Sequence, residues 1–314
     1  MKISIVAPIG ITAEELSFYQ DKFEAAGHKL ESHTDLPTDI GLLNERFKDV
    51  DIALLANQGI PGEVYKSAEN LKILSVAFTG VDHVPVQYCE ENGITVCNAA
   101  GYSTNAVAEL TFGMVIDLFR HICNGHKQTT EGNDRQGFLG TELFGKTFGV
   151  IGAGAIGLRV AEIAKAFGCR VLAYSRTKKD IHGVEFVELD ELLQNSDIVS
   201  LHVPLMEGTN QLINAEKLAL MKNDAVLINT ARGPVVDYSA LKYSLINKGI
   251  AGAALDVYEY EPPLKKDHIM LDAPNCLLLP HVAYATKEAI AIRTKIVMEN
   301  IFAWLNKQPV NVIV

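Results

Sequence analysis

Residues 147–177 read TFGVIGAGAIGLRVAEIAKAFGCRVLAYSRT, and they indicate the fold more clearly than any other part of the sequence. Two apolar runs, Phe148–Ile151 and Arg170–Tyr174, have the length and composition of buried strands. Between them, a glycine-rich turn opens a segment whose apolar residues recur at helical spacing: Ile156, Val160, Ile163, Ala164 and Phe167. The stretch therefore predicts a strand–helix–strand unit in which the two strands pair in parallel.

The glycines of this turn follow the order G-x-G-x-x-G, at Gly152, Gly154 and Gly157. The first permits a tight turn, the second lets the backbone approach a pyrophosphate, and the third lets the helix pack closely on the strand. Free N–H groups at the start of the helix, where Ala155 and Ile156 lie, face the phosphates together with the positive end of the helix dipole. Because the motif lies between a strand and a helix, it predicts a bound dinucleotide, NAD or NADP.

The end of the second strand bears on the ribose of that cofactor. An NAD enzyme usually carries a carboxylate here for the 2′-hydroxyl, but this chain reads Ser175-Arg176-Thr177 and has no carboxylate before Asp180. A hydroxyl beside a guanidinium can bind a 2′-phosphate, which a carboxylate would repel. The pattern favours NADP(H); the alternative is a solvated basic turn that still accepts NAD(H).

The composition is that of a globular protein with an acidic balance. Of the 314 residues, 48% are hydrophobic and 21% are charged, and the formal net charge is -10. This charge argues against a nucleic acid or an anionic membrane as a partner, and no apolar run reaches the roughly 18 residues of a membrane span. Five scattered cysteines without a C-x-x-C pair suit a reducing cytoplasm and offer no metal site.

Strand and helix patterns alternate along the chain, which predicts parallel sheets covered by helices. Besides the glycine unit, the expected strands are Ile3–Ala7, Asp51–Ala56, Ile73–Ala77, Ile94–Cys97, Asp197–His202, Ala225–Asn229, Gly252–Asp256 and Cys276–Leu279. The expected helices include Ala13–Ala26, Pro61–Ala68, Pro85–Glu91, Tyr102–Ile122 and Lys287–Leu305. We expect an α/β protein with two doubly wound parallel sheets, in which a Rossmann cofactor domain (99–286) is inserted into a flavodoxin-like substrate domain (1–98 and 287–314).

Three of the expected strands end in reactive side chains. LINTARG (227–233) delivers Arg232, ALDVYEYEP (254–262) carries three carboxylates, and LLPHVAY (278–284) delivers His281. The carboxyl ends of parallel strands in an open sheet face the ligand crevice. A planar guanidinium suits a carboxylate that adjoins a carbonyl, and an imidazole near a carboxylate can donate a proton to a nascent alkoxide.

Taken with GAGAIG (152–157) and HVPL (202–205), these motifs resemble those of the D-isomer-specific 2-hydroxyacid dehydrogenase family over nearly the whole chain. The resemblance implies catalytic roles for Arg232, Glu261 and His281, with Glu261 as the carboxylate that holds the histidine protonated. Asp256 resembles the family residue that supports this site and the cofactor. The implied reaction is the reversible reduction of a 2-oxo acid by NAD(P)H to an (R)-2-hydroxy acid.

The glycine pattern and the resemblance together imply a wider set of binding residues. Those expected to bind the cofactor are Gly152, Gly154, Ala155, Ile156, Gly157, Ser175, Arg176, Thr177, His202, Val203, Pro204, Thr209, Thr230, Ala231, Arg232, Asp256 and His281. Those expected to bind the substrate are Phe78, Thr79, Gly80, Val81, Tyr102 and Tyr284. In the family, backbone amides of the loop at 78–81 bind the substrate carboxylate; for Tyr102, packing at the hinge is an equally good interpretation.

Substrate, function class and assembly keep alternatives. Phe78 and Tyr284 favour a longer 2-oxo acid, whereas Ser175-Arg176-Thr177 resembles the signature of NADPH-dependent glyoxylate and hydroxypyruvate reductases in the family. The second function class is a dinucleotide-sensing binding protein, like the transcriptional corepressors built on this fold, which keep the same Arg, Glu and His. The family dimerises through the region of the apolar 102–122 helix, so we expect a homodimer; burial within one subunit is the alternative.

Overall fold

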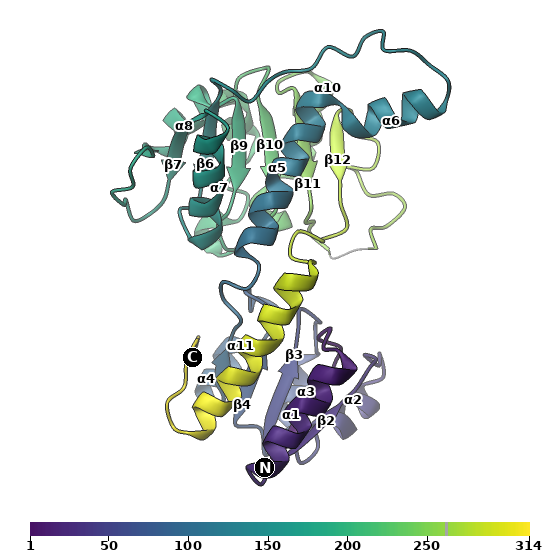
Figure 1. Cartoon of the computed structure of the whole chain (residues 1–314), viewed down its shortest axis with the longest axis vertical. Helices are drawn as coiled ribbons and strands as arrows, with labels where there is room; N and C mark the ends of the chain where they lie inside the picture. The colour runs from purple at the N-terminus through teal and green to yellow at the C-terminus, as the bar shows by residue number, and fades with distance from the viewer. Residues whose placement is uncertain (261–262) are drawn as a thin grey trace. The chain divides into compact units, whose positions relative to one another are not determined.

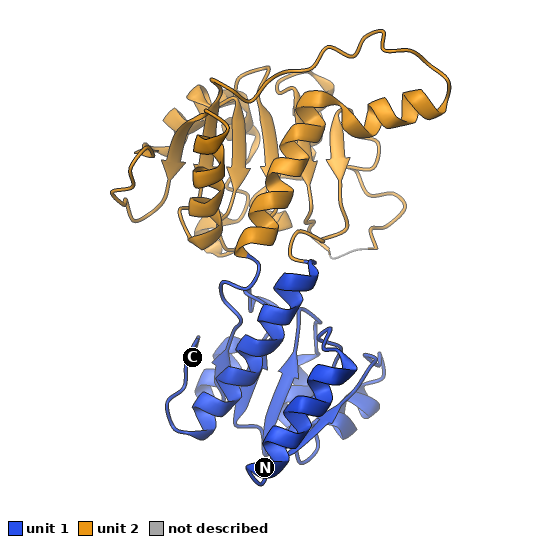
Figure 2. Ribbon diagram, in the orientation of Figure 1, with its two compact units in different colours: residues 1–103, 285–314 blue, residues 104–284 orange. Residues whose placement is uncertain are grey.

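The computed structural model describes residues 1–260 and 263–314, and it divides the chain into two compact units (Figure 1). Unit 1 contains residues 1–103 and 285–314, and unit 2 contains residues 104–284 (Figure 2). The chain passes from unit 1 to unit 2 and back, with changeovers at 103/104 and 284/285. The sequence placed these changeovers at 98/99 and 286/287.

Unit 1 is built on a five-stranded parallel sheet in the order β2-β1-β3-β4-β5. Its strands are β1 (Lys2–Ile5), β2 (Lys29–Ser32), β3 (Ile52–Leu55), β4 (Ile73–Val76) and β5 (Thr95–Cys97). Its helices are α1 (Ala13–Ala25), α2 (Ile40–Phe47), α3 (Gly62–Ser67), α4 (Val86–Glu91) and α11 (Lys287–Leu305). The strand order 2-1-3-4-5 is that of a flavodoxin-like sheet, as the sequence predicted.

Unit 2 is built on a seven-stranded parallel sheet in the order β12-β11-β10-β9-β6-β7-β8. Its strands are β6 (Thr147–Ile151), β7 (Arg170–Tyr174), β8 (Glu185–Phe186), β9 (Ile198–Leu201), β10 (Val226–Asn229), β11 (Gly252–Leu255) and β12 (Cys276–Leu278). Its helices are α5 (Thr104–Arg120), α6 (Ile122–Thr130), α7 (Ala155–Ala166), α8 (Leu189–Asn195), α9 (Ala215–Leu220) and α10 (Tyr238–Ile246), with 3₁₀ turns at Glu207–Thr209 and Gly233–Val235. Numbered within the unit, this is the Rossmann order 3-2-1-4-5-6 with one strand added beyond the sixth, so the expected fold class is confirmed.

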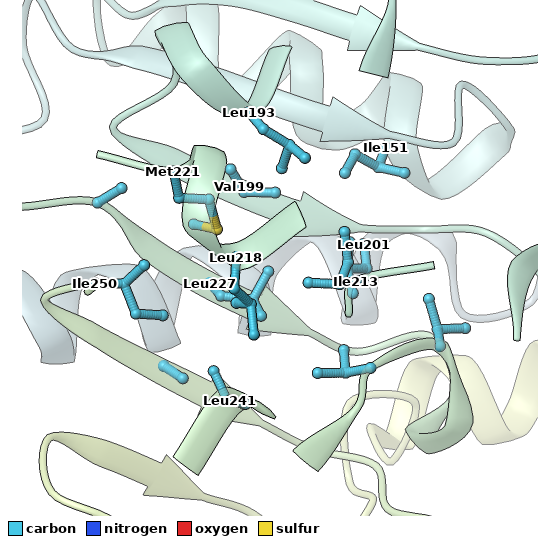
Figure 3. Close-up of a cluster of buried hydrophobic side chains, with 14 of the residues drawn as sticks. Ile151, Leu193, Val199, Leu201, Ile213, Leu218, Met221, Leu227, Leu241 and Ile250 are labelled. Atoms are coloured by element: carbon cyan, nitrogen blue, oxygen red, sulfur yellow. The ribbon is translucent and has the colours of Figure 1, made fainter. Parts of the chain in front are cut away.

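Apolar residues follow one another along the strands of unit 2, without alternating with polar residues, because helices cover both faces of the sheet. Side chains alternate between two cores: Leu227 belongs to one cluster, while its neighbours Val226 and Ile228 belong to the other. Helices α8, α9 and α10 supply the first cluster, which Figure 3 shows with the strand residues Ile151, Val199, Leu201 and Leu227 among those labelled. Helices α5 and α7 supply the second. Burial on two faces therefore explains strands such as β9 and β10, in which every residue is buried.

Two elements of the structure differ from what the sequence predicts. Strand β2 was not predicted, because its residues KLES lack an apolar run; it lies at the edge of the sheet, and one of its four residues is buried. The helix predicted over 102–122 is present as α5, but it is shorter: it ends at Arg120, His121 adopts a left-handed conformation (φ 54°), and a second helix, α6, begins at Ile122. Asp117 then accepts a hydrogen bond from the backbone N–H of Cys123 (2.7 Å). Within the described ranges, none of the helices combines the length and the apolar character required to cross a membrane.

Candidate active site

In the glycine turn between β6 and α7, two of the glycines lie where a side chain would clash with the backbone, and the third lies beside open space. Gly152 has φ +104°, and a Cβ there would lie 2.4 Å from the carbonyl oxygen of His202. A Cβ on Gly157 would lie 1.9 Å from the carbonyl oxygen of Gly152. Gly154, which precedes α7, has no atom within 4 Å of a Cβ position and no side chain that caps the helix. Two glycines are therefore required by the fold, and the third leaves open space beside free helix N–H groups.

A pocket of about 470 Å³ lies beside this turn, within unit 2. Its lining residues are Gly152, Ala153, Gly154, Tyr174, Ser175, Arg176, Thr177, Lys179, His202, Val203, Pro204, Met206, Gly208, Thr209 and Leu212. They follow the carboxyl ends of β6, β7 and β9. The strand order reverses between β6 and β9, and ligands of open α/β sheets bind at such a switch point. The pocket and the open space at Gly154 together fit the phosphates and the adenosine of a dinucleotide.

The basic turn after β7 forms one wall of this pocket. Ser175 is half-buried, while Arg176 and Thr177 are exposed, and all three residues line the pocket. The guanidinium of Arg176 forms no ion pair with any residue in the described part of the chain. Lys178 pairs with Glu188 (2.9 Å), but Lys179 donates a hydrogen bond to the carbonyl oxygen of Ala153 in the glycine turn (2.8 Å).

The segment after β9 also lines this pocket. Burial lowers the pKa of His202 to about 3, so its imidazole is neutral, and Nε2 lies 2.8 Å from the hydroxyl of buried Ser200. The Thr209 hydroxyl donates to the carbonyl of Pro204 (2.6 Å) and accepts from the N–H of Met206 (2.9 Å). These bonds hold the 204–209 loop in a fixed curve beside the pocket.

Arg232 lies in a tight turn at the carboxyl end of β10. The buried side chain of Asn229 braces this turn: its oxygen accepts from the N–H of Ala231 (3.0 Å), and its amide donates to the carbonyl of Arg232 (2.9 Å). A Cβ on Gly233 would lie 1.9 Å from the carbonyl carbon of Tyr258. Only glycine therefore allows the Arg232 turn to approach the segment that follows β11.

The segment that carries His281 is held by Asp256 at the end of β11. Asp256 is fully buried, and its carboxylate accepts hydrogen bonds from two consecutive N–H groups, those of Val282 and Ala283 (both 2.8 Å). His281 has φ 57°, and its ring lies edge-on to Tyr284, with 5.7 Å between the ring centres. The buried carboxylate therefore fixes the backbone on the carboxyl side of the histidine.

The acidic segment after β11 includes a carboxylate whose structure is described and one whose structure is not. Glu259 lies 3.1 Å from Nε2 of His268, and the hydroxyl of Tyr258 donates to the carbonyl of Leu279 at the end of β12 (2.8 Å). Glu261, the residue expected to hold the catalytic histidine, lies outside the described residues. Strands β10, β11 and β12 are neighbours, so the turn of Arg232, the Asp256 segment and His281 follow adjacent strand ends.

In unit 1, the loop expected to bind the substrate carboxylate follows β4. Asn98 donates to the carbonyl of Thr79 (2.8 Å), and the N–H of Ala99 donates to the carbonyl of Phe78 (2.9 Å). The 78–81 backbone is thus tied to the segment after β5. The side chain of Tyr102 is buried, with its ring 6.3 Å from that of Phe78 and 5.6 Å from the guanidinium carbon of Arg293.

Sequence reasoning missed two residues that shape the site. Lys179 lies five residues beyond Tyr174, the last residue of β7, and only its bond to Ala153 reveals that it faces the pocket. Asn229 belongs to the Arg232 motif, but no role was predicted for it from the sequence. Its full burial in the structure indicates one, because a buried amide needs hydrogen-bond partners. Among the described residues, no group of His, Cys, Asp and Glu could hold a metal ion.

Comparison with known proteins places the chain in a family. A profile described as "D-isomer specific 2-hydroxyacid dehydrogenase, NAD binding domain" matches residues 112–283. A glyoxylate reductase of Pyrococcus furiosus is 37% identical, over 97% of this chain and 93% of its own. Two solved structures are similar: an acyclic imino acid reductase (Bsp5) in complex with NADPH and D-Arg (TM-score 0.91, 33% identity, all of both chains) and a D-lactate dehydrogenase of Aquifex aeolicus with NAD and lactic acid (TM-score 0.85, 30% identity, 98% and 96% of the chains). The chain belongs to the D-isomer-specific 2-hydroxyacid dehydrogenase family.

Proposed function

We propose that this protein reduces a 2-oxo acid to an (R)-2-hydroxy acid with NAD(P)H. The observation that carries the proposal is that Arg232 and His281 follow the carboxyl ends of β10 and β12, which flank β11 in the sheet that also forms the glycine pocket. Relatives named glyoxylate reductase, hydroxypyruvate reductase and D-lactate dehydrogenase support it. Unit 2 would then be the cofactor domain and unit 1 the substrate domain.

The chemistry assigns a separate task to each residue. Arg232 binds the substrate carboxylate through its planar fork and polarises the adjoining carbonyl. His281 donates the proton to the developing alkoxide, and Glu261 holds the imidazole protonated. Asp256 acts as a positioning residue, because it fixes the backbone beyond His281. A bound nicotinamide cofactor supplies the hydride.

Residues of unit 1 are also proposed to bind the substrate. The amides of Thr79, Gly80 and Val81 are proposed to bind the carboxylate, in a loop that Asn98 holds in place. Phe78 and Tyr102 are both buried, which limits the room beside this loop and supports a small 2-oxo acid. In unit 2, Tyr284, whose ring lies edge-on to that of His281, is proposed as a further substrate contact.

NADP(H) is proposed as the preferred form of the cofactor. Arg176 lines the pocket and forms no ion pair with a described residue, so its guanidinium is available to a 2′-phosphate. Ser175 and Thr177 add hydroxyl groups to the same wall. Similar proteins have been solved with NADPH and with NAD, so the preference needs its own test.

The test is absorbance at 340 nm with NADPH and, separately, NADH. Candidate substrates are glyoxylate, hydroxypyruvate, pyruvate, 2-oxoisocaproate and phenylpyruvate, and the best of them sizes the pocket. Oxidation of NADPH that exceeds that of NADH supports both parts of the proposal. Equal rates, or faster oxidation of NADH, refute the cofactor preference. No turnover with any of these acids would instead favour a dinucleotide-sensing binding protein.

A homodimer is proposed as the assembly. Figure 1 shows α6 extending away from the sheet of unit 2, and the irregular segment that follows it carries exposed apolar side chains. Leu139 is 92% exposed and Phe144 77%, and Ile122 at the start of α6 is 54% exposed. Large apolar side chains that gather on a surface are typical of a protein–protein interface. A second copy would cover them, and elution of the protein as a monomer at micromolar concentration would refute this.

We also propose a reducing compartment, since all five cysteines are free thiols.

A further inference from the structure

Two adjacent lysines beside the cofactor pocket have different partners. Lys178 pairs with Glu188, and both side chains are well exposed, at 62% and 74%. Lys179 instead lines the pocket and donates to the carbonyl oxygen of Ala153 (2.8 Å). The turn after β7 is thereby tied to the glycine turn after β6, between two residues that both line the pocket. The second lysine of the pair is the one that reaches the ligand site.

The bond to Ala153 leaves most of the hydrogen-bond donors of Lys179 unused. An ammonium group has three N–H donors, and a backbone carbonyl is a neutral acceptor that takes one of them. Lys179 forms no ion pair with any residue of the described ranges. A phosphate dianion accepts shorter and stronger hydrogen bonds from ammonium than a carbonyl does. The bond to Ala153 is therefore one that a phosphate in this pocket can replace.

We propose that Lys179 is a latch that reads the 2′-phosphate of the adenosine. Without that phosphate, the ammonium holds the Ala153 carbonyl and restrains the glycine turn. With it, the ammonium moves to the phosphate beside Arg176, Ser175 and Thr177, and the turn is released. The proposal rests on the proposed cofactor site and adds to it a second cation and a conformational consequence. Nucleotides that lack the 2′-phosphate leave the latch closed.

Isothermal titration with two nucleotide fragments tests the first part. The probes are 2′,5′-ADP and 5′-AMP, which differ only in the 2′-phosphate, and the proteins are wild type, Lys179→Met and Lys178→Met. We expect Lys179→Met to lose at least tenfold in affinity for 2′,5′-ADP, and to bind 5′-AMP within twofold of wild type. Lys178→Met is the matched control and should bind both probes within twofold of wild type. Because both lysines are exposed, neither change should alter the melting temperature by more than about 1 °C.

Hydrogen exchange tests the latch itself. Without nucleotide, the amides of residues 152–157 should exchange faster in Lys179→Met than in wild type, and at the wild-type rate in Lys178→Met. In wild type, 2′,5′-ADP should leave these amides less protected than 5′-AMP does, because only 2′,5′-ADP draws Lys179 away from Ala153. Exchange that is the same in wild type and Lys179→Met would overturn the latch.

Other outcomes overturn the phosphate assignment. An equal loss of both probes in Lys179→Met would mean that the lysine supports the site as a whole, and no loss would leave the 2′-phosphate to Arg176. Tighter binding of 5′-AMP than of 2′,5′-ADP by wild type would also refute it. None of these measurements needs turnover, so they stand apart from the proposed reaction: the latch can fail in an active reductase, and it can hold in a protein that reduces none of the acids tested.

Discussion

Two glycines of one turn give a matched pair of substitutions, Gly157→Ala and Gly154→Ala. A Cβ at 157 would lie 1.9 Å from the carbonyl oxygen of Gly152, and 3.1 Å from a methyl of Val150. A Cβ at 154 would meet no atom within 4 Å, and the backbone there is extended (φ −79°, ψ −169°), which alanine adopts freely. We therefore expect the first change to disturb the fold and the second to disturb only the ligand.

The magnitudes follow from these contacts. In Gly157→Ala, the turn must open by about 1.1 Å to restore a 3.0 Å separation, and overpacking of this kind costs about 3 kcal/mol. Alanine recovers about 1 kcal/mol of that through its helix propensity, which leaves a net loss of about 2 kcal/mol in the free energy of unfolding. For a unit of this size the loss lowers the melting temperature by about 5 °C. Gly154→Ala should change the free energy of unfolding by less than about 0.5 kcal/mol.

Cofactor binding should separate the two variants from wild type in a second way. The methyl group of Gly154→Ala would project into the pocket where the pyrophosphate approaches, so we expect at least a tenfold loss of NADPH affinity, or about 1.4 kcal/mol. Thermal melts without cofactor measure the stability, and quenching of NADPH fluorescence measures the dissociation constant. The reasoning is refuted by a Gly154→Ala protein that binds NADPH as wild type does, or by a Gly157→Ala protein that melts at the wild-type temperature.

Three further predictions concern the strand ends. Arg232→Lys keeps the charge but loses the planar fork, so kcat/KM should fall at least about 100-fold with an unchanged melting temperature; equal turnover would remove Arg232 from the proposed role. Asp256→Asn replaces one of two acceptor oxygens by a donor that faces an N–H, so both kcat and the melting temperature should fall, and a variant altered in neither would show that the segment needs no clamp. Burial lowers the pKa of His202 from 6.5 to about 3, so below pH 6.5 a proton binds this histidine more readily in the unfolded chain than in the folded one. The free energy of unfolding therefore decreases as the pH is lowered, and we expect this group to cost about 3 kcal/mol by pH 4. Urea titrations at pH 7 and pH 4 should show that loss in wild type, and an undiminished loss in His202→Gln would assign it elsewhere.

The sequence predicts the framework of this protein because buried parallel strands leave a plain signal. Strands β9 and β10 are buried throughout and apolar except for Ser200 and Asn229, and the glycine turn is spaced for a helix that starts beside a phosphate. The strand β2 left no such signal, since it lies at the sheet edge and its residues KLES include only one apolar side chain. The break between α5 and α6 was also hidden, because a left-handed His121 is a backbone choice that hydrophobic spacing does not encode.

The candidate site divides in the same way. Residues at strand ends, such as Arg232 and His281, could be located from the sequence, because parallel strands deliver their carboxyl ends to one edge of the sheet. Residues that work through a turn could not. Nothing in the order Lys178-Lys179 says which lysine points toward Ala153, because the direction of each side chain depends on the path of an irregular loop.

The placement of His281 illustrates why the supporting residues matter as much as the reactive ones. Its left-handed backbone costs about 1–2 kcal/mol for a residue with a side chain, a cost that an isolated strand end would relieve by rotating away. Two hydrogen bonds to a buried carboxylate, each worth about 1.5–3 kcal/mol, more than offset that cost. The position of the histidine after β12 is therefore set by an aspartate after β11. Asp256 and His281 are 25 positions apart in the sequence, but the motifs that carry them form one structural unit, and a change in either should be read as a change in both.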